Sequence, residues 1–371
     1  MPGAADYRQR GAALPTINRG LVDELRDGQR LQLRTTKQCR SARGSRLSGV
    51  GLALLLGVAA GRAASAADAD AAHEGSVDMA SSGRLGEYPM MRDASGTSWQ
   101  PDSALMSGAH GQLGNWSTML HGYLYAITDH QGGPRGAQLN FSESMPMLMA
   151  QRNADTVRVA LKAMQSLDPL MGKRGYPLLL QTGENADGIT PLIDRQHPHD
   201  LFMELAASAN LPLSERTSAF VYAGYPGEPA LGPPTFMHRY SAYGKPEAPI
   251  SHHWLDSSHT SYGVFTSGLV SGHWKTELSA FNGREPDPFR WNLDPLRIDS
   301  WSGRLSWNLL SSLALQLSYG AIHSPEALEP EVNVRRSTIS AVLDRPLSPG
   351  HWQTTLAWGQ NRVAPGAASA A

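Results

Sequence analysis

The 371-residue chain has little of several residue types, and each shortage excludes a class of protein. Charged residues make up 18% of the chain, below the roughly 25% of typical soluble domains, and the formal net charge is -1. A chain without a basic excess lacks the electrostatic footprint of a nucleic-acid-binding protein, so we expect no nucleic-acid partner. Intrinsic disorder needs low hydrophobicity, whereas 41% of these residues are hydrophobic. The one cysteine, Cys39, provides no disulfide framework.

Long apolar runs are also missing, because none reaches the ~20 residues that a membrane-spanning helix needs. The run at 47–60 follows a basic stretch and precedes an Ala-Ser-Ala sequence at 64–66, which is the order of features in a secretory signal peptide. A membrane anchor is the alternative, but the run is short and Arg62 interrupts it. We therefore predict that residues 1–66 are an N-terminal extension and a cleaved signal peptide. Whether residues 1–36 are translated in the cell stays open.

The rest of the chain divides into two parts. Residues 67–115 are rich in Ala, Ser, Gly and Asp and lack a sustained apolar period, so they are predicted to be a flexible lead-in. From Trp116 onward, apolar and polar residues alternate with period two, as Leu305 and Ser306 illustrate. Such alternation indicates strands. Segments of about ten residues exceed the usual ~5–6 residues of globular strands and match tilted membrane-spanning strands.

Eleven strands and their connections can be placed by this pattern. The predicted strands cover residues 116–127, 137–150, 155–167, 200–211, 217–224, 259–270, 273–282, 298–309, 312–321, 335–344 and 351–360. Short and long connections alternate between them, which is typical of an outer-membrane barrel with short periplasmic turns and long outer loops. We therefore predict an all-β fold, an antiparallel up-and-down transmembrane β-barrel over residues 116–371. A soluble β-sandwich or propeller is the alternative.

The odd strand count conflicts with the even number that bacterial single-chain barrels use. Either one strand has escaped detection in 80–115 or 168–199, or the chain lacks its last strands. We favour a barrel of about 12 or more strands that is truncated at its C-terminus. The localisation expected is the outer membrane, after export through the cleaved signal peptide. Outer-membrane lipid and the barrel-assembly machinery are then the expected partners.

Four short sequences between the predicted strands carry a resemblance to a known family. They are the residues at 181–185 (QTGEN), 197–200 (HPHD), 237–239 (MHR) and 249–256 (PISHHWLD). With them, the stretch from Trp116 to Arg362 resembles a family of uncharacterised Gram-negative outer-membrane barrel proteins, porin-like, some of which occur near heavy-metal resistance genes. The resemblance covers about two thirds of the chain. It implies the fold more than the function, because the family has no established activity, and its relatives look longer at the C-terminus.

Histidines are concentrated in two consecutive long loops, where aspartates accompany them. Imidazole and carboxylate groups suit zinc, copper or nickel, and the two loops are expected to open on the same rim of the barrel. The candidate metal ligands are His197, His199, His238, His252, His253, Asp256 and His259. The spacing is not a compact ligand motif. The alternative is a folded-in loop whose histidines satisfy buried polar groups.

The functional expectation follows from the barrel. We expect a porin-like channel for small solutes or metal ions. The alternatives are a non-conducting binding or structural barrel with a folded-in, histidine-rich loop and, third, an outer-membrane hydrolase. We expect no enzyme and no cofactor beyond a divalent metal ion. Met145, Met147 and Met149 share one strand face. Their thioethers would suit Cu(I), but a lipid-facing or gap-filling stripe is the interpretation that the sequence favours.

Overall fold

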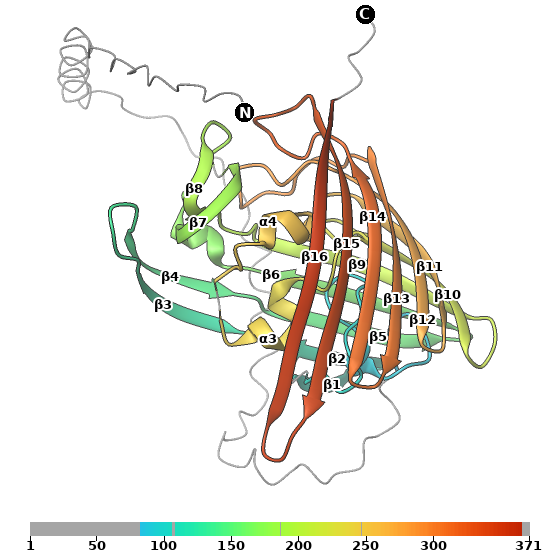
Figure 1. The fold of residues 1–371 in the computed structure, drawn as a ribbon. Helices are drawn as coiled ribbons and strands as arrows, with labels where there is room; N and C mark the ends of the chain where they lie inside the picture. Colours follow the sequence, from blue (N-terminus) through green and yellow to red (C-terminus); the bar gives the residue numbers. More distant parts are fainter. Residues whose placement is uncertain (1–81, 106–107, 186, 246, 366–371) are drawn as a thin grey trace, which may run out of the picture. The chain divides into compact units, whose positions relative to one another are not determined.

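The computed structural model describes residues 82–105, 108–185, 187–245 and 247–365. The predicted extension and signal peptide (1–66) and the start of the predicted lead-in lie outside the described residues. Within them the fold is nearly all β, with short helical turns between strands (Figure 1). A helix long and apolar enough to cross a membrane is absent from this part of the chain.

The elements follow one another along the chain with few interruptions. The strands are β1 (Ala109–Leu113), β2 (Trp116–His121), β3 (Leu124–His130), β4 (Gln138–Ser144), β5 (Met147–Ala154), β6 (Val157–Gln165), β7 (Tyr176–Asn185), β8 (Pro191–Gln196), β9 (Phe202–Pro212), β10 (Thr217–Gly224), β11 (Val264–Ser271), β12 (Trp274–Phe281), β13 (Ser300–Leu310), β14 (Leu313–Ile322), β15 (Val332–Pro346) and β16 (His351–Pro365). The helical turns are η1 (Met90–Arg92), η2 (Asp168–Met171), η3 (Phe236–His238), α3 (Tyr240–Tyr243), α4 (His252–Leu255) and η4 (Ser257–His259).

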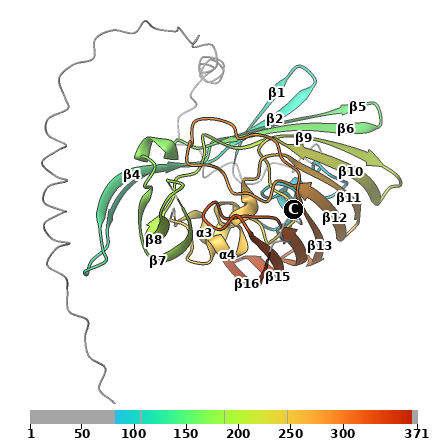
Figure 2. The same ribbon diagram turned by 90° about the horizontal axis from the view of Figure 1, so that it is seen from above.

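Twelve of the strands form one antiparallel sheet in the order β1-β2-β5-β6-β9-β10-β11-β12-β13-β14-β15-β16. The hairpins β3–β4 and β7–β8 form two separate two-stranded sheets. Seen from above, the large sheet curves from β1 round to β16, with α3 and α4 on its concave side (Figure 2). Its edges are β1 and β16, which are not paired with each other in the described residues. The prediction of an all-β, antiparallel, up-and-down fold with about twelve strands is confirmed.

The strand boundaries differ from the predicted ones where the backbone bends. The predicted strand 116–127 is divided into β2 and β3 at Gly122, and the predicted strand 137–150 is divided into β4 and β5 next to Pro146. Gly122 has φ +145°, and a Cβ on it would lie only 2.0 Å from the carbonyl oxygen of Met145. Only glycine permits this close approach, so the ribbon bends here and β3–β4 leaves the sheet.

Three further differences concern segments without a clear period-two pattern. The twelfth strand is β1, which lies within the predicted lead-in and is only five residues long. The hairpin β7–β8 occupies part of the loop predicted at 168–199. The strand predicted at 259–270 begins only at Val264, because the preceding chain forms η4 and a bend. Short or irregular segments such as these carry too few alternating residues to indicate a strand.

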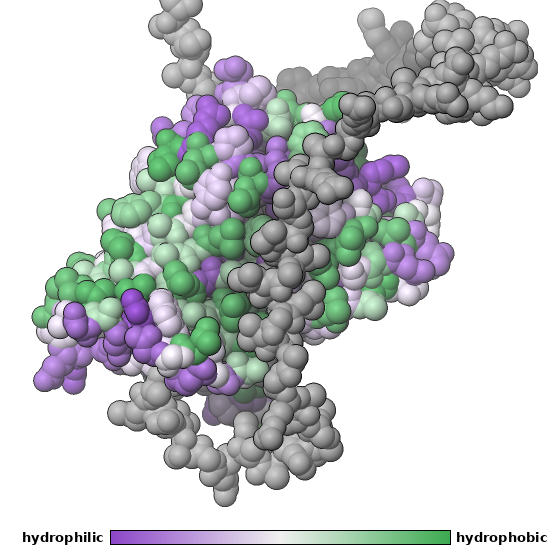
Figure 3. Space-filling view, turned by 180° about the vertical axis from the view of Figure 1, so that it is seen from behind, coloured by the Kyte–Doolittle hydropathy of each residue, from purple (hydrophilic) through white to green (hydrophobic). Residues whose placement is uncertain are grey.

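The convex face of the large sheet is apolar. Leu305, Leu317, Ile339 and Trp358 are register partners in turn across β13, β14, β15 and β16, and each is between 37% and 55% exposed. Figure 3, seen from behind, shows apolar residues spread over much of that face and hydrophilic residues gathered mainly towards its margins. A contiguous apolar face of this size is unusual on a soluble monomer, where exposed apolar patches rarely exceed a few hundred Å². It matches the lipid-facing band of an outer-membrane protein.

The concave face carries polar and charged residues that are buried. Lys275, Ser306, Gln316 and Ser340 are register partners across β12, β13, β14 and β15. Glu277 forms an ion pair with Arg304, with 2.9 Å between Glu277 Oε2 and Arg304 Nε, and both side chains are fully buried. Removing one partner of such a pair costs about 3–5 kcal/mol, because the other charge is left uncompensated. The sheet is therefore polar inside and apolar outside, the reverse of a soluble protein.

Residues 82–105, here called the inner segment, lie against this concave face. Asn210 of β9 donates a hydrogen bond to the carbonyl of Leu85 at 2.6 Å, and Arg304 of β13 donates one to Thr97 Oγ1 at 2.9 Å. Trp99, which is 3% exposed, packs in a cluster with Phe220 of β10. The sequence predicted a flexible lead-in at 67–115, but the inner segment is buried and held by several strands. Its contacts use backbone carbonyls and isolated side chains, which leave no periodic pattern in the sequence.

Residues 225–245 and 247–263, here called the inner loop, lie between β10 and β11 and also pack inside the sheet. Gly232 donates a backbone hydrogen bond to Ser318 Oγ of β14 at 2.9 Å. The inner loop also binds the inner segment, because Ser95 donates to Glu228 Oε1 at 3.1 Å and the backbone N–H of Thr235 donates to Ser95 Oγ at 2.8 Å. The inner loop is thus a folded-in loop, which the sequence had left open as an alternative.

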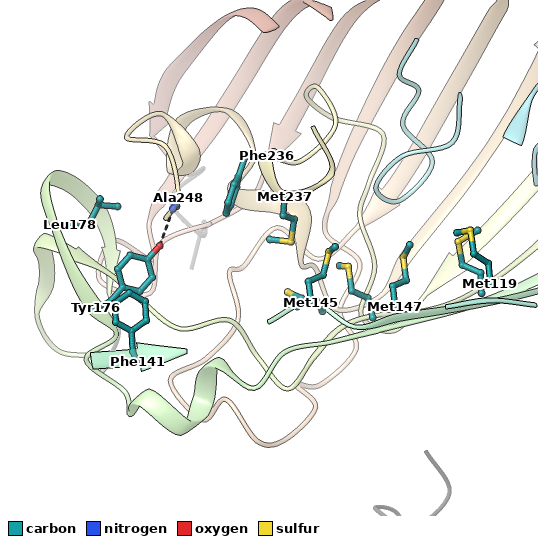
Figure 4. Close-up of a cluster of buried hydrophobic side chains, with 12 residues drawn as sticks. Met119, Phe141, Met145, Met147, Tyr176, Leu178, Phe236, Met237 and Ala248 are labelled. Atoms are coloured by element: carbon teal, nitrogen blue, oxygen red, sulfur yellow. Dashed lines mark hydrogen bonds between the residues drawn. The ribbon is translucent and has the colours of Figure 1, made fainter. Parts of the chain in front are cut away.

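A cluster of buried apolar side chains lies where β2, β5 and β6 meet the inner loop (Figure 4). Seven of its twelve members are methionines. Met145, Met147 and Met149 are among them and are at most 8% exposed, whereas Leu148 points outward and is 38% exposed. The lipid-facing interpretation of the three methionines was therefore wrong. They lie on the inner face, which is compatible with the gap-filling interpretation and with ligation of Cu(I).

Candidate metal centre

Three histidines predicted as metal ligands meet inside the fold. His199 follows β8, His252 begins α4, and His259 ends η4. One ring nitrogen from each lies within 4.8 Å of the other two. The His252 and His259 ring centroids are 4.8 Å apart, and those of His199 and His259 are 5.2 Å apart. The trio is almost excluded from solvent, since His252 is 0% exposed and the His199 side chain 11%.

Each imidazole of the trio is oriented through its Nδ1 atom. The Nδ1 of His199 lies 2.8 Å from Asp168 Oδ2, and that of His252 lies 3.2 Å from Asp256 Oδ2. The Nδ1 of His259 lies 2.7 Å from the backbone carbonyl of Asp256. A carboxylate or carbonyl at this position accepts a hydrogen bond from Nδ1–H and so leaves Nε2 as the lone-pair donor, which is the usual arrangement around metal-binding histidines.

The Nε2 atoms of His199 and His252 are buried and accept or donate no hydrogen bond among the described residues. Burying an imidazole nitrogen without a partner costs free energy comparable to a lost hydrogen bond. A metal ion bound at about 2.0–2.1 Å from each nitrogen would remove that cost and would require small rotations of the rings towards one another. The donor set therefore fits a transition-metal ion.

A small cavity of about 10 Å³ touches two of the trio, His199 and His259. Asp200, Glu285 and Arg290 also line it. About 10–15 Å³ of such space is enough for one water molecule. The space beside the trio therefore suits a single additional ligand, the open position that three-histidine sites keep.

The charges near the trio come mainly from two aspartates. Asp256 is buried, and although burial opposes its ionisation, the hydrogen bond with His252 and the Arg239 guanidinium hold the pKa of its carboxyl below its usual range. Asp200 pairs with Arg290 at 3.0 Å, and burial raises the pKa of its carboxyl against the effect of that arginine. An ionised Asp256 behind His252 increases the basicity of the imidazole and offsets part of the positive charge of a bound ion.

The other predicted ligands lie around the trio without joining it. His197 and His253 stack on each other with centroids 5.3 Å apart, and their Nδ1 atoms face the backbone carbonyls of Pro198 and Thr182. Asp256 acts behind the trio through its contacts with His252 and His259. His238 is not part of the trio, and its ring lies 6.2 Å from that of His121 on β2.

The sequence analysis missed two residues that matter at this site and its surroundings. Asp168, in η2, orients His199, and His121 accompanies His238. Asp168 precedes a proline in a long loop, so only the three-dimensional path of that loop brings it to His199. His121 occupies an ordinary alternating position in β2, and nothing in its spacing distinguishes it from other inward-facing residues.

Comparison with known proteins adds little to this description. No family model matches the chain, and no curated protein matches it. Among solved structures, it is similar to the crystal structure of Pseudomonas aeruginosa OpdL. The sequences are 11% identical, the match covers 69% of this chain and 79% of that chain, and the TM-score is 0.25. A TM-score this low supports no conclusion about fold or function.

Proposed function

We propose that this protein is an outer-membrane barrel with a closed interior that binds a divalent transition-metal ion through His199, His252 and His259. The observation that carries the proposal is the convergence of one ring nitrogen from each of the three histidines within 4.8 Å, in rings whose Nδ1 atoms all lie beside an oxygen. Histidines that only fill a loop have no reason to share this common orientation.

The chemistry of the trio narrows the choice of metal. Three neutral imidazoles suit zinc, copper or nickel, whereas calcium and magnesium prefer sets of oxygen ligands. The trio keeps one side towards the small cavity, so a fourth ligand would be water or a group carried by an incoming molecule. A barrel that holds such an ion within its outer loops would serve the handling of metal ions at the cell surface.

The membrane location is supported by the distribution of side chains. The convex face presents apolar residues across adjacent strands, and the concave face buries ion pairs. Short turns join the strands at one end and long connections join them at the other. These features are typical of barrels whose outer face contacts lipid.

Calorimetric titration of the folded protein in detergent with Zn²⁺ and Cu²⁺ tests the metal site. We expect the wild type to bind one ion with Kd below about 100 μM, which corresponds to about 5.5 kcal/mol. The double variant His252→Ala/His259→Ala should bind at least tenfold more weakly, because two of the three donors are gone. His273→Ala, which changes a histidine in the short β11–β12 turn, is the matched control and should bind as the wild type does. Equal binding by the wild type and the double variant would place the ion elsewhere.

A solute channel is the second candidate function, favoured by the polar concave face of the sheet. In the structure this face is covered by the inner segment and the inner loop, which hydrogen-bond to residues on β9, β13 and β14. Conduction would therefore require one of these two covers to move. The metal site and the channel are compatible, because the trio belongs in part to the inner loop.

A further inference from the structure

The methionine-rich cluster on the concave face has a composition that simple packing does not require. Leucine and phenylalanine fill protein cores with well-defined rotamers, whereas methionine is usually a minor gap-filler. Here Met119, Met145, Met147, Met149, Met164, Met203 and Met237 are all buried in one cluster. Thioethers are weak hydrogen-bond acceptors but good ligands for soft metal ions, and they select Cu(I).

Strand register places histidine and methionine side chains of β2, β5 and β6 next to one another. His121 of β2 faces Met147 of β5, which in turn faces Met164 of β6. Two residues along, Met119 faces Met149. Directly paired residues of antiparallel strands have Cβ atoms about 4.5–5.5 Å apart on the same face, so these side chains are near neighbours.

The inner loop completes the cluster from the opposite side. Met237 and His238 lie in η3, and Met237 belongs to the same buried cluster as Met145 and Met147 (Figure 4). The ring of His238 lies 6.2 Å from that of His121. Two strands and one loop therefore bring sulfur and nitrogen donors to the same place from both sides.

The two imidazoles provide the second and independent indication of a ligand. His238 is only 9% exposed, and its Nε2 atom, like that of His121, has no hydrogen-bond partner among the described residues. A buried imidazole with an unused nitrogen, next to a cluster of thioethers, is suited to donate its lone pair to a metal ion.

The electrostatic surroundings favour an ion of low charge. Lys162 of β6 lies next to the cluster, because it is the register partner of Met149 on β5. Its ammonium is paired with Glu204 at 2.9 Å, so its charge is largely balanced. The thioether and imidazole donors are all neutral, and neutral soft ligands stabilise a monovalent ion at less desolvation cost than a divalent one.

A cavity continues from the cluster towards the short-turn end of the sheet. It measures about 500 Å³, and Met119 and Met149 line it together with Met90, Met91 and His110. At the other end of the cluster, the ring of Phe236 packs against His252 of the trio at 5.0 Å. Sulfur and nitrogen donors therefore extend along the interior from the cavity to the neighbourhood of the trio.

We propose that the thioethers of Met145, Met147 and Met237, together with the imidazoles of His121 and His238, form a binding site for Cu(I) inside the barrel. This soft-metal site is distinct from the histidine trio in its ligands and its preferred ion, and it does not depend on the trio binding a metal. Silver, as Ag(I), has the same ligand preference without copper's redox chemistry and serves as the probe that separates binding from oxidation.

The test is a competition titration of the full chain, folded in detergent, against a chromogenic Cu(I) chelator under anaerobic, reducing conditions. The double variant Met147→Leu/Met237→Leu keeps side-chain volume nearly constant and should preserve the fold, because volume-conserving exchanges cost less than ~1.5 kcal/mol. We expect at least a tenfold loss of Cu(I) affinity, and a parallel loss for Ag(I) by calorimetry. Met171→Leu, at the margin of the cluster in η2, is the matched control and should bind as the wild type does.

Two further measurements keep the sites and the fold apart. The methionine variant should bind Zn²⁺ as the wild type does, whereas His252→Ala/His259→Ala should retain Cu(I) binding. X-ray absorption of the wild-type Cu(I) complex should show sulfur scatterers together with nitrogen, a result that needs no variant. Equal Cu(I) affinity in the wild type and the methionine variant, or a metal shell without sulfur, would overturn the proposal.

Discussion

Outward-facing leucines on β13 make the membrane assignment testable one residue at a time. Leu305 and Leu309 lie on the same face of that strand, the first near its middle and the second near its short-turn end. Arginine costs about 2–4 kcal/mol on a lipid-facing strand at the bilayer midplane, but only ~0–1 kcal/mol near the interface. In a soluble protein the two exposed positions would tolerate arginine equally well.

We therefore predict that Leu305→Arg lowers the yield of folded protein in lipid vesicles severely, while Leu309→Arg has a small effect. The measurement is the fraction of protein that migrates as the folded species in unheated gel electrophoresis after refolding. Similar yields for the two variants would mean that the convex face does not contact lipid at the depth that the strand pattern requires.

Glu228 joins the inner segment to the inner loop and makes their contact sensitive to pH. Burial raises the pKa of its carboxyl to about 7, against the opposing effects of Arg304 and the hydrogen bond from Ser95. The Glu204 carboxylate adds to the increase, and Thr235 opposes it. Because the pKa is higher in the folded state than in the unfolded state, the resulting stabilisation is complete below pH ~4.5 and is lost as the pH rises through about 7.

The expected result is that amide hydrogens of residues 82–105 exchange several-fold faster at pH 8 than at pH 5, after correction for intrinsic exchange rates. Glu228→Gln keeps the hydrogen-bonding shape without the charge, so its corrected exchange should be nearly independent of pH over this range. A pH dependence in the variant as large as that of the wild type would assign the effect to other groups, such as Asp294, whose pKa burial raises to about 6.

At the scale of elements, the inner segment is the structural feature that closes the concave face. It contacts strands from β6 to β15, including a hydrogen bond from Ser103 to the carbonyl of Asp344 at 2.6 Å. The strands hold one another through their own ladders, so the sheet does not need the segment in order to form. The segment behaves as a cover, and its removal should open a polar passage.

We predict that deletion of residues 84–103 converts a protein without measurable conductance into one with discrete channel openings in planar bilayers. Deletion of residues 132–135, at the exposed tip of the β3–β4 hairpin, removes chain that lies outside the large sheet and should leave conductance unmeasurable. Large openings in the wild type, or none after deletion of the inner segment, would contradict an interior closed by this cover.

How much of these elements the sequence predicts depends on their regularity. The strands from β10 to β16 carry period-two alternation over eight or more residues, and their boundaries mostly agree with the predicted ones to within a few residues. The bends at Gly122 and Pro146, the five-residue β1 and the inner segment were not predictable by the same means. Their positions depend on single backbone contacts and on strands distant in the sequence, which no local pattern records.

The same contrast holds for the site. Residue chemistry and loop position identified His199, His252 and His259 among seven candidates, but not which of the seven converge. The conformation of the inner loop separates His238 from the trio and places it beside His121, and η2 provides Asp168. Loops of this length have no periodicity from which side-chain direction could be derived.

At the scale of the whole molecule, the structure is a curved sheet with an apolar exterior and an interior filled by the inner segment and the inner loop. The three histidines of the trio come from two parts of the chain, because His199 follows β8 whereas His252 and His259 belong to the inner loop. The trio therefore forms only when the interior is folded. A bound ion would stabilise the folded form by mass action, because the unfolded chain lacks the preformed set of donors. Under the proposed function, metal binding and closure of the interior are therefore expected to be coupled.

The most direct test of the central claim is anomalous X-ray diffraction from crystals of the protein grown with zinc. We predict one strong anomalous peak about 2.0–2.1 Å from the Nε2 atoms of His199, His252 and His259, within an interior still filled by the inner segment. Zinc peaks confined to surface histidines, with the trio showing none, would contradict the account.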